Sequence, residues 1–118
     1  MIWFKKKSKP VYEKTRVMVL DPDLGFDVRW MDHRIDSLAE IIGNHPFGIP
    51  IKGTNLNAHS VPAVVSDDKR PNIEIEGKKL TGIVVIMAAE DEKIKGLSKI
   101  VSISADEVIF VLNTFNLK

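Results

Sequence analysis

The chain has 118 residues, of which 44% are hydrophobic and 28% are charged, with a formal net charge of +1; this composition is typical of one globular domain and excludes intrinsic disorder. The absence of cysteine excludes disulfides, thiolate zinc sites and a cysteine nucleophile. The longest internal apolar run, from Ile83 to Ala89, is far shorter than the roughly 20 residues of a membrane-spanning helix.

We divide the chain into a basic N-terminal arm, residues 1–10, and a single domain, residues 11–118. The arm holds Lys5, Lys6, Lys7 and Lys9, so the rest of the chain has a net charge of −3 against +1 for the whole. Such a mildly acidic body gives no strong signal for nucleic-acid binding. We expect no secretory signal, because the apolar residues precede the lysines and are too few, and we therefore expect a cytoplasmic protein.

Trp3 and Phe4 precede three consecutive lysines, Lys5, Lys6 and Lys7, within this arm. Aromatic side chains next to lysines are typical of segments that contact an anionic membrane surface. These five residues are therefore candidates for such a contact. The alternative is an appendage without a binding role.

The first predicted element of the domain is a hairpin of two strands, Thr15–Leu20 and Phe26–Met31. The connection from Asp21 to Gly25 contains a proline, two aspartates and a glycine, which all favour turns. Alternation in the second strand predicts a buried face with Phe26, Val28 and Trp30 and an exposed face with Asp27 and Arg29.

Two short helices are predicted from capping patterns, in which a serine is followed three residues later by glutamate. The first spans residues 36–43, with Ser37 as the cap and Gly43 as the terminator. The second runs from Ala105 to about Thr114 after Ser104. Its predicted buried stripe contains Val108, Ile109, Val111, Leu112 and Phe115.

The middle of the chain predicts several further strands. These are an edge strand at Phe47–Ile51, a strand at Val61–Val65 after a polar loop at Lys52–Ser60, a half-exposed strand around Ile73 and Ile75, and a central strand at residues 82–87. A solvated turn is predicted at Glu90–Lys93, and Leu97–Ile103 reads as either strand or loop. The fold class predicted is α+β, with a mixed or mostly antiparallel sheet of about four to six strands and two short helices.

The sequence contains no phosphate-binding glycine loop and no metal-binding HExxH motif. A hydrolase built on His59 and Ser60, with Asp67 or Asp68, is disfavoured because neighbouring side chains of an extended chain point in opposite directions. We therefore predict no catalytic residue, no metal site and no cofactor.

Two polar loops form the candidate ligand site. One contributes Asn55, Asn57 and His59, and the other contributes Lys69, Arg70 and Asn72. Asparagine amides both donate and accept hydrogen bonds, and two cations favour a phosphate, so the set fits a nucleotide-like small ligand or the rim of a protein interface. The alternative is that these residues occupy loops for backbone reasons alone.

Four segments resemble a small uncharacterised family of phage and mobile-element accessory proteins. They are the strand Arg16–Leu20, the segment IDSLAEIIG at Ile35–Gly43, the segment GIVVIMAAED at Gly82–Asp91, and the terminal helix after ISADE. The resemblance implies a compact protein without known enzyme activity that binds and inhibits a host macromolecule. We also expect a homo-oligomer, namely a homodimer.

Overall fold

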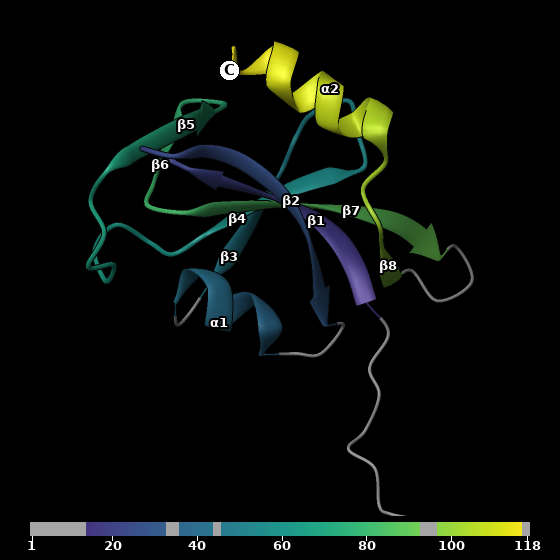
Figure 1. The fold of residues 1–118 in the computed structure, drawn as a ribbon, viewed down its shortest axis with the longest axis horizontal. Helices are drawn as coiled ribbons and strands as arrows, with labels where there is room; N and C mark the ends of the chain where they lie inside the picture. Colours follow the sequence, from purple (N-terminus) through teal and green to yellow (C-terminus); the bar gives the residue numbers. More distant parts are fainter. Residues whose placement is uncertain (1–13, 33–35, 44–45, 93–96, 117–118) are drawn as a thin grey trace, which may run out of the picture.

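The computed structural model describes residues 14–32, 36–43, 46–92 and 97–116, which form an α+β fold and confirm the predicted class (Figure 1). The strands are β1 (Lys14–Asp21), β2 (Gly25–Asp32), β3 (Phe47–Pro50), β4 (Leu56–Ser60), β5 (Pro71–Ile75), β6 (Lys78–Thr81), β7 (Val84–Glu92) and β8 (Leu97–Val101). The helices are α1 (Ser37–Ile42) and α2 (Ala105–Thr114).

Six of these strands form one antiparallel sheet in the order β2-β1-β7-β4-β3, with β8 also paired to β7. The predicted central strand is β7, which pairs with β1, β4 and β8. It begins two residues later than predicted, because Gly82, with a φ of 70°, lies between it and β6. Strands β5 and β6 form a separate two-stranded sheet.

The sheet separates two apolar layers, and one helix covers each (Figure 1). On the α2 face, Met18, Leu56 and Ile86 pack with Val111 of α2, and all four are almost fully buried. On the α1 face, buried residues of β1 and β7 pack with the partly buried apolar side chains of α1, namely Leu38, Ile41 and Ile42. Burial of apolar area in these two layers is the main stabilising contribution.

Capping explains where α2 begins, as predicted. The Ser104 hydroxyl accepts a bond from the Glu107 amide over 3.1 Å, and the Glu107 carboxylate accepts one from the Ser104 amide over 2.8 Å. In α1 the predicted cap is wrong: the N-cap is Asp36, and Ser37 is the first helical residue, with a buried side chain.

No helix within the described residues has both the length and the apolar character needed to cross a membrane.

Three predictions in the middle of the chain are wrong, one of a strand, one of a loop and one of a turn. The segment Val61–Val65 is a turn, because Pro62 has no amide for a sheet and its carbonyl accepts the amides of Val65 and Ser66. The strand lies earlier, at β4, in the stretch predicted as a polar loop; Leu56, Ala58 and Ser60 alternate inward there. The predicted turn at 90–93 is also wrong over its first three residues, which belong to β7 and pair with β8.

The predicted burial of β2 is wrong as well. Phe26, Val28 and Trp30 do share one face, but all three are exposed, and Met31 is the buried residue of the strand. The reason is position, since β2 is the last strand of the sheet. In α2, Ile109 of the predicted buried stripe is 54% exposed, because it points away from the sheet that buries Val111.

Candidate functional site

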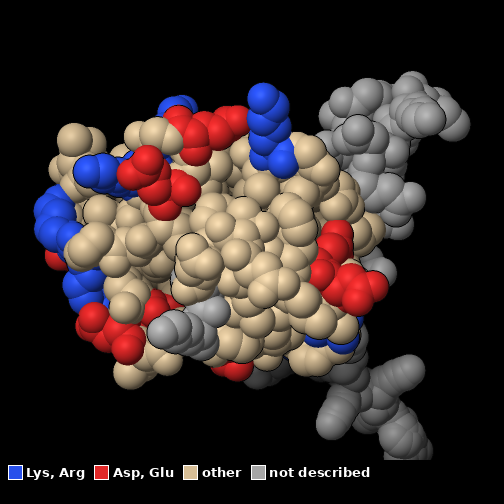
Figure 2. All heavy atoms as spheres, turned by 90° about the horizontal axis from the view of Figure 1, so that it is seen from above, with Lys and Arg blue, Asp and Glu red and all other residues tan. Residues whose placement is uncertain are grey.

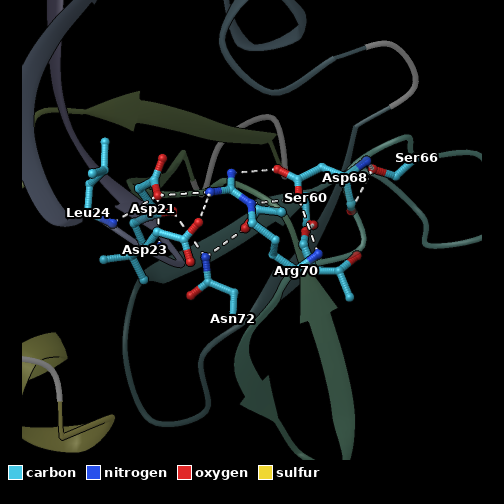
Figure 3. Close-up of polar contacts among 11 residues, drawn as sticks. Asp21, Asp23, Leu24, Ser60, Ser66, Asp68, Arg70 and Asn72 are labelled. Carbon is cyan, nitrogen blue, oxygen red and sulfur yellow. Dashed lines mark hydrogen bonds and ion pairs between the residues drawn. The ribbon is translucent and has the colours of Figure 1, made fainter.

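Arg70 lies among three aspartates where the β1–β2 turn meets the segment before β5 (Figure 3). Its Nη2 and Nε donate to the two carboxylate oxygens of Asp68 over 2.7 and 2.9 Å. Its Nη1 donates to Asp23 over 2.6 Å and lies 3.4 Å from Asp21. The guanidinium therefore binds one carboxylate in a bidentate manner and joins segments 47 residues apart in the sequence.

This charge cluster shifts the pKa values of its members. Hydrogen bonds from the Arg70 side chain and amide lower the pKa of Asp68 to about 2. The amides of Asp23 and Leu24, which donate to Asp21 over 2.9 and 3.0 Å, lower the pKa of Asp21, and Arg70 adds to the effect. Asp68 and Asp23 in turn raise the pKa of Arg70. The cluster therefore favours its charged form.

Asn72 connects the same region to the main sheet. Its Nδ2 donates to the carbonyl oxygens of Leu20, over 3.1 Å, and of Gly82, over 2.7 Å. The Gly82 amide donates to the Arg70 carbonyl over 2.7 Å. A Cβ at position 82 would lie 3.2 Å from the Asp68 side chain, so glycine suits both the backbone conformation and the close approach. We call Arg70, Asn72 and the three aspartates the Arg70–Asn72 joint.

The other predicted ligand residues lie along or near β4. Asn57 and His59 pair with Met87 and Val85 of β7, so their side chains share the α1 face of the sheet. The His59 ring lies over Gly48 of β3, where a Cβ would be 2.9 Å from Nε2. Burial lowers the pKa of His59, while the nearby backbone of Val85 opposes this shift, and Nδ1 has no hydrogen-bond partner among the described residues.

The two remaining candidates use other contacts. Asn55 is exposed, and its backbone carbonyl accepts the Ala89 amide. The Lys69 ammonium donates to the Ala63 carbonyl within its own loop. The structure thus brings Arg70 and Asn72 together and places the β4 residues on a separate face of the sheet. The six candidates do not line one described pocket.

A groove of about 430 Å³ lies next to the joint, between the β1–β2 turn, β5 and the C-terminal end of α2. Pro22 contributes from the turn, Phe26 from β2 and Ile73 from β5, and Phe115 follows the last residue of α2. Its polar groups include the exposed Glu74. The groove therefore has mixed walls, in which apolar side chains alternate with polar groups that include the carboxylates of Asp21 and Glu74.

Exposed apolar side chains continue outward from this groove. On β2, Phe26, Val28 and Trp30 are 40%, 37% and 59% exposed, and on α2 Phe110 is 43% exposed. Phe110 and the groove residue Thr114 are four residues apart and so lie on one flank of α2. Figure 2 shows the face that carries α2, with a broad central area of uncharged residues and charged side chains toward its rim. Exposed apolar area of this kind marks interaction surfaces.

Some sequence predictions lie outside the described residues. These are the contacts predicted for the arm with Trp3, Phe4, Lys5, Lys6 and Lys7. Over the residues that are described, no group of three or more histidine, aspartate and glutamate side chains is placed to hold a metal ion.

The chain was compared with known proteins at three levels. No family model, no curated protein sequence and no solved structure matches it. The family resemblance of the four segments therefore stays a prediction, and the functional argument depends on the geometry of the chain itself.

Sequence reasoning missed the groove and the exposed apolar residues. Alternation of apolar and polar residues shows that a strand has two unlike faces, but it does not show whether another element covers the apolar face. One signal was present: β2 follows directly on a tight hairpin turn, so it has a partner on one side only unless a later strand joins it.

Proposed function

We propose that the chain is a small, non-enzymatic binding protein of the phage or mobile-element type, which acts in the cytoplasm by occupying a host protein. The observation that carries this proposal is the groove beside α2, with Phe26 and Phe115 in its walls and the exposed Phe110 on the same flank of the helix as Thr114. Aromatic side chains that are exposed around a concave site are typical of protein-binding surfaces.

The chemistry of the groove defines the kind of partner. The apolar side chains in its mixed walls, Phe26 and Phe115 among them, fit an apolar side chain, and the exposed Glu74 favours a neighbouring lysine or arginine on the partner. We therefore expect a protein that presents an apolar residue next to a basic one. A nucleotide is the weaker occupant, because the guanidinium nitrogens of Arg70 already bind Asp68 and Asp23, and a phosphate would have to displace these carboxylates.

The test is native mass spectrometry of the chain purified from its own host, repeated with groove variants. A protein partner that remains on the wild type should be lost with Phe110→Asp and weakened by Glu74→Lys. Val64→Asp is the matched control, because Val64 is 89% exposed and lies outside the groove.

Two outcomes would overturn the proposal. One is a partner that binds the Phe110→Asp, Glu74→Lys and Val64→Asp variants equally well, since neither the groove nor the flank of α2 beside it would then have a part in recognition. The other is a bound nucleotide that disappears with Arg70→Ala, which would place the function at the Arg70–Asn72 joint instead.

A further inference from the structure

The outer edge of β2 lacks several of the features that usually protect an edge strand. Its eight residues pair with β1 in an unbroken register, without a bulge. The strand contains neither proline nor lysine, and no strand of the described part of the chain pairs with its other side. Natural edge strands are commonly short, bulged or marked by proline and lysine, so that they do not pair with another chain.

The two faces of β2 differ in chemistry. Phe26, Val28 and Trp30 lie opposite Leu20, Met18 and Arg16 of β1 and so share the α2 face. Asp27 and Arg29 lie on the α1 face, with exposed side chains that form an ion pair of 3.4 Å along the strand. Each face therefore presents a short, ordered set of groups to a neighbour at the outer edge.

We infer that β2 pairs with β2 of a second copy of this chain, antiparallel, about a twofold axis at Val28. In this register Val28 lies opposite its own copy and Phe26 lies opposite Trp30. On the other face Asp27 lies opposite Arg29, so two ion pairs form across the interface. Aromatic pairs and opposite charges placed directly across from one another are the pairs that stabilise antiparallel strands.

The neighbouring symmetric registers are unfavourable. An axis at Asp27 places two aspartates opposite each other, and an axis at Arg29 places two arginines opposite each other. Like charges directly across an antiparallel pair are destabilising. Complementarity of charge therefore selects the Val28 register.

This pairing gives a closed dimer and not a fibre. A twofold axis uses the same edge of both copies, so among the described strands β3 ends the order on each side and the five-residue β8 stays paired to β7. β3 has four residues and ends in Pro50, so it is a poor template for further strands. Both α2 helices then lie on one side of the joined sheet, and the two sets of Phe26, Val28 and Trp30 meet between them. The inference goes beyond the proposed function, since it concerns a different partner and a different edge.

The first experiment measures the molar mass by analytical ultracentrifugation over a concentration series. The wild type should show a reversible monomer–dimer equilibrium. Asp27→Arg and Arg29→Asp should each weaken the dimer about tenfold or more, because each converts both cross-strand ion pairs into like-charge pairs. An equimolar mixture of the two variants should recover the dimer, since arginines of one copy then face aspartates of the other.

The double variant Asp27→Arg/Arg29→Asp should dimerise like the wild type, because the exchanged charges are again complementary. A wild type that stays monomeric up to about 0.5 mM would overturn the inference. So would a dimer that the single charge variants leave unchanged. Circular dichroism of each variant separates loss of pairing from loss of folding.

The second experiment tests the register and uses the absence of cysteine from the chain. Val28→Cys places two thiols opposite each other on the axis, so mild oxidation should give a disulfide-linked dimer in high yield. Val64→Cys, at a more exposed position away from β2, is the control and should cross-link only slowly. Equal cross-linking of the two variants would contradict the proposed register.

Discussion

The Arg70–Asn72 joint and the outer edge of β2 reverse the usual relation between residue type and role. In the joint, an arginine and an asparagine of the kind that binds ligands make contacts within the chain, to Asp68 and to the carbonyls of Leu20 and Gly82. On β2, valine and aromatic residues of the kind that fills a core are exposed. The comparison teaches that residue type sets what a side chain can do, whereas its place in the sheet decides what it does.

The largest effect on stability is expected when the side-chain amide of Asn72 is removed from the joint. Asn72→Ala should lower the free energy of unfolding by about 2–3 kcal/mol, because the carbonyls of Leu20 and Gly82 lose their shared donor. Urea denaturation measures the effect. Asn55→Ala is the matched control, with an exposed side chain and an expected change within about 0.5 kcal/mol. Equal stability of the two variants would show that Asn72 has no structural role.

A smaller effect on stability is expected at the N-cap of α2. Ser104→Ala removes the hydroxyl that accepts the Glu107 amide, and should lower the free energy of unfolding by about 1 kcal/mol. Ser104→Asp retains an acceptor and should preserve most of the stability. Thermal unfolding followed by circular dichroism distinguishes the two variants, and an alanine variant as stable as the wild type would contradict the capping argument.

The charges of the joint predict a dependence on pH. Arg70 lowers the pKa of Asp68 from 3.8 to about 2, so the stabilisation that Asp68 provides is complete above pH 4 and is lost as the pH falls through 2. In Arg70→Ala the pKa of Asp68 should rise toward its ordinary value, and stability should fall less steeply between pH 4 and pH 2. Carboxyl titration by NMR should show that Asp21 keeps a lowered pKa, because its backbone donors remain. If Asp68 titrates at the same pH in the wild type and in Arg70→Ala, then Arg70 does not lower its pKa.

The smallest effect on stability is expected for the exposed residues of β2. Val28→Thr should change the free energy of unfolding by less than about 0.5 kcal/mol, when measured at concentrations low enough to keep the chain monomeric. Val17→Thr makes the same substitution on β1, where the side chain is fully buried, and should cost about 1–3 kcal/mol because its hydroxyl enters an apolar layer. Similar losses at the two positions would show that β2 is covered.

Local patterns predicted much of this fold. The capping box at Ser104, the turn from Asp21 to Gly25 and the apolar run of β7 each depend on residues close together in the sequence, and each was predicted correctly in type. The position of β4 was not predicted. Asn57 and His59 are polar residues typical of loops, and their place on the α1 face of the sheet depends on pairing with the distant β7.

The contacts of the candidate site depend on distant residues. Asn72 binds Leu20 across 52 positions, and Arg70 binds Asp23 across 47. No local pattern around position 70 indicates which carboxylates will bind the arginine. The ion pairs of Arg70 could therefore not be predicted from the sequence. The exposure of Trp30 is also non-local, since it depends on which other elements lie next to β2 in the folded chain.

The threefold pairing of β7 has a consequence for how the chain is made. The β1–β2 hairpin and the β3–β4 hairpin can each form from neighbouring residues, but they share no strand until β7 joins them. About three quarters of this sequence, up to Ala88, must therefore leave the ribosome before β1 and β4 can both pair with β7. We expect nascent chains that stop ahead of Val84 to be digested readily by protease, and chains that extend through α2 to resist it.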